Sequence, residues 1–447
     1  MYQLNDDIVA LATIAGKSAI SVVRLSGSSS LVFYKKLLRT SKFPTPNYVN
    51  LVSLYHPKTK KLIDQAMVTF YKSPKSFTGE DCIEFSLHGG VVIANHLIDA
   101  LVLLGAREAM PGEFSYRAFI NDKIDLLQAE AIASVIESTN DLDSYYSLSA
   151  VKGQLSEGVK KSQSIIKNIL TMGEHELDFN ENEINFTKSS QYLADLKKAH
   201  KIIKKTINTS YTVEEKKSGI RLVIVGLPNA GKSSLFNVLV GKSKAIVTNI
   251  SGTTRDVLEQ DVYIKENLTT LVDTAGLRRA ANKIEKIGIK KSFEEIENSD
   301  IVLLVDEKDP AVVYNQIKNK IGKRPVVLIC NKADINKQKP RVGIISISCK
   351  NKSGIDALIT KLSTIIFKKI NAFKLQHSCL INKRQKELLI NIDKDLEKTI
   401  LDYKTNNDLS LCLSLLYGSM DHFNTLLRPI GKNEILNDIF GGFCVGK

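Results

Sequence analysis

Gly226-Leu227-Pro228-Asn229-Ala230-Gly231-Lys232-Ser233 is the stretch that decides the fold of this 447-residue chain. It follows the apolar run 221–225, which predicts a strand, and precedes residues 234–239, which predict a helix. A strand, a glycine-rich loop and a helix in this order are typical of a phosphate-binding loop. The glycines let backbone N–H groups face the phosphates, and the helix N-terminus adds positive potential. We expect Lys232 to reach the β- and γ-phosphates and Ser233 to bind Mg²⁺.

Three further motifs follow in the order found in Ras-like G domains. Asp273-Thr274-Ala275-Gly276 comes after the strand-like run 268–272, and its carboxylate suits the surroundings of Mg²⁺. Asn331-Lys332-Ala333-Asp334 follows the run 326–330, and the Asp334 carboxylate can accept from guanine N1–H and the exocyclic amine. Adenine has no such donor pair, so the motif predicts GTP. Ser348-Cys349-Lys350 resembles the loop that meets the guanine carbonyl, with Cys349 in place of the usual alanine.

The loop between the first two motifs, residues 248–256, predicts a switch segment. We expect Thr254 to complete Mg²⁺ coordination when the γ-phosphate is present, although an inert polar loop is the alternative. The position that orients water in Ras-like proteins holds Leu277, which cannot hydrogen-bond. Arg255, Arg278 and Arg279 are arginine-finger candidates or solvated charges. Asn229 and the Gly-Thr-Thr-Arg loop resemble potassium-activated GTPases, in which neutral oxygens hold K⁺ against the phosphates.

The flanking sequence predicts three kinds of segment. Residues 1–120 mix strand-like runs (20–25, 65–71, 82–87) with a helix over 91–104 that Gly105 stops, as in a small α/β domain. Apolar residues at helical spacing from 126 to 207, and again from 382 to 417, predict long packed helices. Between these two helical stretches, strands alternate with helices, as in a parallel α/β sheet. The predicted domains are 1–120, 121–217 (helical), 218–372 (G domain, inserted) and 373–447 (helical).

Composition narrows the class of protein. Apolar residues make up 43% and charged residues 25%, which excludes collagen-like and disordered chains. No run reaches the ~18 apolar residues of a membrane span, and the first residues lack a secretory signal. Six scattered cysteines without a Cys-x-x-Cys pair predict a reducing, cytoplasmic setting. The net charge of +14 indicates either RNA or another anionic partner, or a composition rich in Lys, Ile and Asn without a partner.

Three further motifs stand outside the G-domain sequence: the C-terminal stretch 442–447 (Gly-Phe-Cys-Val-Gly-Lys), Pro111-Gly112-Glu113-Phe114 and residues 121–126. Through these motifs the whole chain resembles the MnmE (TrmE) family of tRNA-modification GTPases. The resemblance implies an N-terminal folate-binding domain that forms a homodimer, and G domains that pair across K⁺, GTP and Mg²⁺. It also implies work with the flavoprotein MnmG at C5 of the tRNA wobble uridine, forming a carboxymethylaminomethyl- or aminomethyl-uridine. A tetrahydrofolate derivative would supply the carbon.

The resemblance assigns site residues. The K⁺ ligands would be Asn229, Thr248, Ile250 and Thr253, and the Mg²⁺ ligands would be Ser233 and Thr254. The catalytic residues would be Lys232 and Glu285, of which Glu285 would orient the attacking water. Folate contacts would come from Arg24, Glu84, Lys123 and Lys447, with Cys444 nearby. Residues 12–17 depart from the Pro-Pro-Gly-Arg character of the family. The predicted GTP-binding residues are Asn229, Ala230, Gly231, Lys232, Ser233, Ser234, Thr248, Asn249, Ile250, Ser251, Gly252, Thr253, Thr254, Asp273, Thr274, Ala275, Gly276, Asn331, Lys332, Asp334, Ser348, Cys349 and Lys350.

An RNA-binding GTPase of ribosome assembly, of the Era or Der type, is the alternative function. Era-type proteins carry a C-terminal KH domain, and Der-type proteins carry two G domains. This sequence has one set of G-domain motifs and a helical C-terminal segment. Its motifs therefore favour the tRNA-modification family.

Overall fold

The computed structural model describes residues 2, 4–138, 141–178, 186–212, 220–242, 258–265, 267–273, 293–336, 341–376, 378–429 and 433–446. The chain divides into two compact units. The first comprises Met1–Glu137, Ser147–Asn208 and Arg384–Lys447, and the second comprises Ser138–Tyr146 and Thr209–Lys383. The second unit is thus an insertion in the sequence of the first.

The first unit begins with a mixed sheet covered by two helices. Its elements are β1 (Ile8–Leu11), β2 (Ile20–Ser26), α1 (Ser30–Leu38), β3 (Val49–Tyr55), β4 (Leu62–Tyr71), β5 (Cys82–His88), α2 (Val91–Leu104) and β6 (Arg107–Glu108). The strand order is β3-β4-β5-β2-β1-β6, and only β6 pairs in parallel, with β1. Gly105, at a φ of +116°, ends α2 where the sequence predicted.

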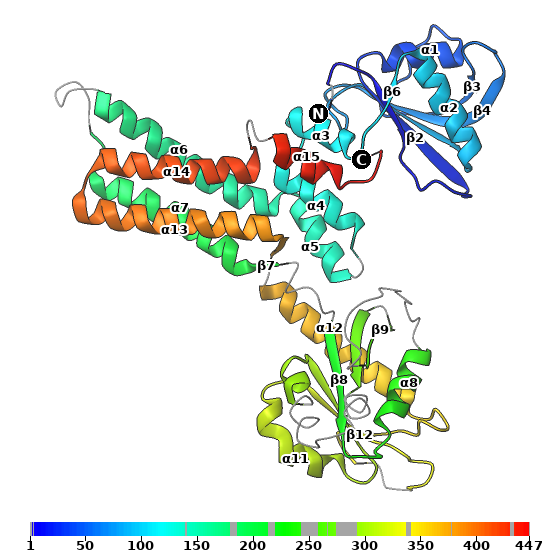
Figure 1. Cartoon of the computed structure of the whole chain (residues 1–447), viewed down its shortest axis with the longest axis vertical. Coiled ribbons are helices and arrows are strands. Elements are labelled where there is room, and N and C mark those ends of the chain that lie inside the picture. Colours follow the sequence, from blue (N-terminus) through cyan, green and yellow to red (C-terminus); the bar gives the residue numbers. More distant parts are fainter. Residues whose placement is uncertain are drawn as a thin grey trace. The chain divides into compact units, whose positions relative to one another are not determined.

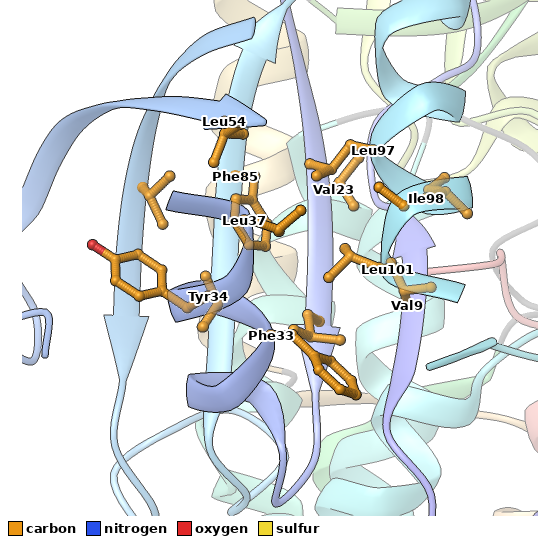
Figure 2. Packing of buried hydrophobic residues seen from close by; sticks show 14 of the residues in the cluster. Val9, Val23, Phe33, Tyr34, Leu37, Leu54, Phe85, Leu97, Ile98 and Leu101 are labelled. Carbon is orange, nitrogen blue, oxygen red and sulfur yellow. The ribbon is translucent and has the colours of Figure 1, made fainter. Parts of the chain in front are cut away.

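One face of this sheet forms the core with α1 and α2. Side chains alternate between the two faces of a strand, so every second residue points toward the helices. Figure 2 shows Val9, Val23 and Phe85 from the strands facing Phe33 of α1 and Leu97 of α2. All five are buried. On the opposite face, Ile8 and Ala10 of β1 pack against Phe114, whereas Leu51 of β3 and Met67 of β4 are exposed.

Helices make up the rest of the first unit. Their bounds are α3 (Glu113–Ile120), α4 (Leu126–Ile136), α5 (Asp141–Val151), α6 (Gln154–Asp178), α7 (Ser189–Thr209), α13 (Lys383–Asn406), α14 (Leu409–Leu427) and α15 (Asn433–Gly441). The first part of α5, through Tyr146, belongs to the second unit. Figure 1 shows α6, α7, α13 and α14 side by side, although α13 and α14 lie far from α6 and α7 in the sequence. Hydrogen bonds join the neighbours, from Ser162 to Ala199, Gln163 to Asn424, and between His200 and Asp393 and between His422 and Asp395. Among the described residues, no helix is long and apolar enough to cross a membrane.

The second unit contains a sheet whose strands alternate with helices along the chain, as expected of a G domain. Its elements are β7 (Ser210–Thr212), β8 (Ile220–Gly226), α8 (Lys232–Lys242), β9 (Leu258–Ile264), β10 (Asn267–Asp273), β11 (Ile301–Asp306), α11 (Pro310–Ile321), β12 (Val326–Cys330), β13 (Ile344–Ser346), α12 (Ile355–Gln376) and β14 (Cys379–Ile381). The main sheet has the order β13-β12-β11-β8-β10-β9, and only β9 is antiparallel. The strand order reverses at β8, and ligands bind at such switch points.

These observations confirm the predicted fold class. A small α/β segment comes first, and a P-loop α/β unit interrupts a helical one in the sequence. All six cysteines lie in the described part of the chain, and all are free thiols.

Candidate nucleotide-binding site

The loop of residues 226–231 connects the end of β8 to the start of α8. A Cβ on Gly226 would lie 2.0 Å from the carbonyl oxygen of Val305 in β11. Gly231 has a φ of +90°, and a Cβ there would lie 2.1 Å from Nδ2 of Asn331. Close backbone approach at the first position and left-handed backbone at the second therefore require glycine.

Lys232 lies at the first position of α8 and is buried. Its Nζ donates to the carbonyl oxygens of Gly226 at 3.0 Å and Leu227 at 2.8 Å. The ammonium group is therefore on the inner side of the loop. That is where a lysine of this motif meets phosphate oxygens.

Ser233 and Asp273 form the second polar contact of the loop. The Ser233 Oγ donates to Oδ2 of Asp273, at the end of β10, over 2.7 Å. Asp273 is fully buried. Hydroxyl and carboxylate oxygens suit Mg²⁺, which uses few protein ligands and fills its coordination with phosphate oxygens and water. Among the described residues, no group of three or more His, Cys, Asp or Glu side chains could hold a metal.

Asn331 connects the two halves of the site. This side chain is 2% exposed. Its Nδ2 donates to the carbonyl oxygen of Ala230 in the phosphate loop at 3.0 Å, and its Oδ1 accepts from the backbone N–H of Cys349 at 3.3 Å. One amide thus bonds both to the phosphate loop and to the loop after β13, although these segments lie more than 100 residues apart in the sequence.

Asp334 is held by Ser348 and remains accessible. The Ser348 Oγ donates to Oδ1 of Asp334 at 2.6 Å. This hydrogen bond, helped by the charges of Lys350 and Lys332, lowers the pKa of Asp334. Asp334 is only partly buried, so its carboxylate remains accessible as a hydrogen-bond acceptor.

Lys332 and Cys349 complete the described part of the guanine motifs. The Lys332 Nζ pairs with Oε2 of Glu307 at 2.6 Å, which lowers the pKa of Glu307. Burial raises the pKa of the Cys349 thiol, so this side chain is neutral near pH 7. The Cys349 backbone N–H makes the structural contact, so replacing the usual alanine leaves that contact intact.

The structure brings part of the predicted site together. The predicted residues within 229–234, 331–334 and 348–350, together with Asp273, lie at the carboxyl ends of β8, β10, β12 and β13. The predicted residues Thr248, Asn249, Ile250, Ser251, Gly252, Thr253, Thr254, Thr274, Ala275, Gly276, Glu285 and Lys447 lie outside the described residues. The switch candidates Arg255, Leu277, Arg278 and Arg279 lie outside them too.

A second polar site lies on the N-terminal sheet. Arg24 in β2 is directly opposite Glu84 in β5, and Nη2 and Oε1 are 2.7 Å apart. Both side chains are about a quarter exposed, at 23% and 27%. The Tyr71 hydroxyl donates to Glu84 at 3.3 Å, and the Phe77 ring centroid lies 6.0 Å from Cζ of Arg24. Burial, together with the Glu84 charge, raises the pKa of Tyr71.

The C-terminal tail reaches this second site. The Gly446 carbonyl oxygen accepts from Nη1 of Arg24 at 3.0 Å. Gly446 has a φ of +88°, and a Cβ there would lie 2.8 Å from the Leu11 carbonyl oxygen. Lys123 donates to the Pro74 carbonyl oxygen at 2.7 Å, on the loop that carries Phe77. Arg24, Glu84 and the tail therefore meet, whereas Lys123 contacts the neighbouring loop.

Sequence reasoning missed three residues of these sites. Tyr71 and Phe77 contact the Arg24–Glu84 pair, and Glu307 pairs with Lys332. Strand alternation could have placed Tyr71 on the same face as Glu84, because Tyr71 lies two residues from Thr69, which pairs with Glu84 on the neighbouring strand. No local pattern marks Phe77 or Glu307, because both act through contacts with distant segments.

Two family models together match nearly the whole chain. One, described as the N-terminus of the GTP-binding protein TrmE, matches residues 7–123. The other, described as the MnmE helical domain, matches residues 126–444. The chain belongs to the MnmE family.

Curated MnmE proteins align with the chain from end to end. The tRNA modification GTPase MnmE of Sulfurimonas denitrificans is 34% identical over 99% of this chain and 100% of that protein. The tRNA modification GTPase MnmE of Wigglesworthia glossinidia brevipalpis is 36% identical over 99% of each. A solved G domain of the T. maritima FeoB iron transporter is 23% identical, with a TM-score of 0.25, over 33% of this chain and 97% of that one.

Membership of the MnmE family confirms the resemblance drawn from the motifs. It also confirms the prediction of a GTPase of the tRNA-modification class. The alternative of an Era- or Der-type protein is disfavoured, because MnmE proteins match this chain over 99% of its length.

Proposed function

We propose that this chain is a potassium-activated GTP hydrolase that acts in modification of C5 of the tRNA wobble uridine. It forms carboxymethylaminomethyl- or aminomethyl-uridine together with the flavoprotein MnmG, and a tetrahydrofolate derivative supplies the carbon. It works as a homodimer, in the cytoplasm, where its tRNA substrate is.

The observation that carries the GTPase part is the double contact of Asn331. It fixes the guanine-binding segment relative to the phosphate loop, so a base and its phosphates bind to one rigid frame. Phosphoryl transfer depends mainly on such positioning and on charge stabilisation. Lys232 neutralises phosphate charge, and Ser233 would hold Mg²⁺, whose charge would offset that of the phosphate oxygens. Glu285 orients the attacking water.

Asn229 supports the potassium part of the proposal. It has a φ of +61° in the phosphate loop, and its side chain is exposed. No hydrogen bond from its amide group to another described residue is found. A neutral amide oxygen at this place suits K⁺, which would add positive charge beside the phosphates as an arginine finger does. Thr248, Ile250 and Thr253 would supply the other ligands.

The Arg24–Glu84 site supports the folate part. A pterin ring presents adjacent N–H donors that pair with a carboxylate such as Glu84. The Phe77 ring is partly exposed beside the pair and offers a stacking surface. Cations such as Lys123 and Lys447 suit the glutamate tail of a folate. The tail contact at Gly446 joins this site to α15 and hence to the helical segments.

The outer face of the N-terminal sheet supports the homodimer. Leu51 in β3 is opposite Met67 in β4, and both point away from α1 and α2. They are 62% and 50% exposed, and neighbouring Val49 is 59% exposed. Clustered apolar side chains at a sheet edge mark an association surface. The pairing of Thr69 with Glu84 places the folate candidate on this same face.

Nucleoside analysis of tRNA tests the function. Cells of the source organism that lack this protein should lose C5-modified wobble uridine. The wild-type gene should restore it, and an Asp334→Asn variant should not, because the amide cannot replace the carboxylate acceptor for guanine. Asp356→Asn, at an exposed carboxylate that pairs with Lys242, is the matched control and should restore it. Unchanged C5-modified uridine in the deletion strain would contradict the proposal.

A further inference from the structure

The exposed surface of α7 carries an unusual concentration of positive charge. The helix has five lysines and one aspartate. By comparison, α6 has three lysines and four carboxylates, and α13 has six basic and five acidic residues. No acidic residue occurs between Lys197 and Lys205. The charge on α7 therefore exceeds what a chain that is generally rich in lysine places on the neighbouring helices.

The lysines lie along one side of the helix. Lys197, Lys201 and Lys204 follow the spacing i, i+4, i+7, which places them in a row. At 1.5 Å per residue the row is about 10 Å long. Lys198 and Lys205 flank it, and all five are exposed. Four of the five line an open hollow of about 470 Å³, which is formed by Lys197, His200, Lys201, Lys204, Lys205 and Asn208.

The nearby carboxylates are engaged with other groups. Asp195 accepts from Nε2 of Gln191 at 2.9 Å, and Asp393 of α13 contacts Nε2 of His200 at 2.8 Å. Within the part of the chain that the structure describes, no carboxylate forms an ion pair with Lys197, Lys201 or Lys204. Their charges repel one another, so the row is destabilising unless an anion covers it.

We propose that this lysine row, Lys197, Lys201 and Lys204 on α7, is a docking surface for the phosphate backbone of a folded RNA. Phosphates recur along an RNA strand with one charge each, and flexible lysine ammonium groups bind them without reading sequence. The inference rests on the proposed function, because tRNA is the RNA that the proposed reaction supplies. It adds the surface that holds the substrate, on a helix that contributes no residue to either candidate site.

An anionic membrane would be the other large polyanion, and the structure disfavours it. A helix that lies on a membrane inserts apolar side chains next to its cations. No large apolar side chain of α7 is among the exposed ones. The apolar residues of α7 instead face the other helices, as Leu196, Ala199 and Ile203 are all fully buried.

The test replaces Lys197, Lys201 and Lys204 together by Gln in the full-length protein. Binding of fluorescently labelled tRNA is measured by anisotropy over a range of sodium chloride concentrations. Each lost phosphate contact lowers the slope of log affinity against log salt by about one. We expect a slope smaller by two to three and affinity about tenfold or more weaker at moderate salt.

Two further variants make the result specific. The control variant replaces three exposed lysines of α13 by Gln, namely Lys394, Lys398 and Lys404. It changes the net charge by the same amount, but at lysines that have acidic neighbours. This control should bind tRNA as the wild type does. Replacing the α7 row by Arg keeps the charge and should also preserve binding. GTP hydrolysis without tRNA and circular dichroism should be unchanged in all three variants, which shows that they fold.

Every outcome decides the inference. Equal losses in the α7 and α13 variants would overturn it, since only bulk charge would matter. Unchanged binding in a folded α7 variant would also overturn it, but would leave the proposed function standing because tRNA still binds. Failure of the wild type to bind tRNA would overturn both. If the α7 variant lost binding to phosphatidylglycerol–phosphatidylcholine vesicles but still bound tRNA, the inference would also be overturned. The partner of the lysine row would then be an anionic membrane.

Discussion

At the scale of single residues, Asn331 and Ser348 explain how the guanine site is organised. The sequence predicts both from motifs, because the chemistry of base recognition fixes residue types at short spacings. It does not predict that the Asn331 amide bonds to the phosphate loop, since that contact joins distant segments. Nor does any local pattern show that Ser348 tunes the acidity of Asp334.

The Ser348 contact makes a prediction about pH. The hydrogen bond lowers the pKa of Asp334, so the carboxylate stays ionised, and accepts from guanine, to a lower pH than an ordinary aspartate. In Ser348→Ala this pKa rises toward its usual value, and GDP affinity should begin to fall at a higher pH than in the wild type. Calorimetric titrations between about pH 4 and pH 7 measure this. Ser346→Ala, at an exposed serine two residues away, is the control, and identical profiles for Ser348→Ala and the wild type would refute the coupling.

At the scale of elements, the docking of α15 on α3 depends on one glycine. The periodicity and the stop at Gly105 suffice to predict α2, because local signals set both ends. The position of α15 is different, since it is set by contacts with residues more than 300 positions away in the sequence. Phe440 is fully buried against Tyr116 and Phe119, with ring centroids 5.5 Å and 6.0 Å apart. Gly112, at a φ of +69°, would place a Cβ 2.2 Å from the Phe440 carbonyl oxygen.

Gly112→Ala should therefore loosen α15. The left-handed backbone costs a non-glycine residue about 1–2 kcal/mol, and the close approach to backbone adds to that. Hydrogen exchange of the amides of residues 433–441 should become faster. The hydrogen bond between Arg24 and the Gly446 carbonyl oxygen should be weakened as well. Gly441→Ala is the control on α15 itself, where nothing lies within 4 Å of the added Cβ. It should slow exchange, because alanine favours a helix. Slow exchange in both variants would show that Gly112 does not hold the helix.

At the scale of the whole molecule, the proposed homodimer depends on an apolar sheet face. The sequence predicts a strand over 65–71, which contains Met67, but it does not single out β3, which contains Leu51. Exposure also depends on which face the helices cover, and only the three-dimensional structure shows that. The register between β3 and β4 aligns Leu51 with Met67 on the uncovered side. Likewise, the sequence indicates an inserted domain from the order of its motifs, whereas the pairing of Arg24 with the C-terminal tail emerges only from the fold.

Replacing Leu51 and Met67 by Lys should dissociate the dimer. Two charges on each face would have to lose their hydration and would repel their counterparts. Sedimentation should show monomer at concentrations where the wild type is a dimer. Val312→Lys, at a 55% exposed apolar side chain of α11, is the control for adding charge at an exposed apolar site and should leave the dimer intact. If the double variant remained a dimer, the association surface would have to lie elsewhere on the protein.

The central claim is that a guanine nucleotide and a potassium ion meet at the phosphate loop of the second unit. The most direct test is GTP hydrolysis by the purified full-length protein in potassium chloride and in sodium chloride at equal ionic strength. We predict turnover at least ~10-fold faster in potassium, since a cation at this place acts as an arginine finger does. Asn229→Ala should lose the difference while still binding GDP. Equal rates in the two salts, or no hydrolysis of GTP in either, would contradict the account.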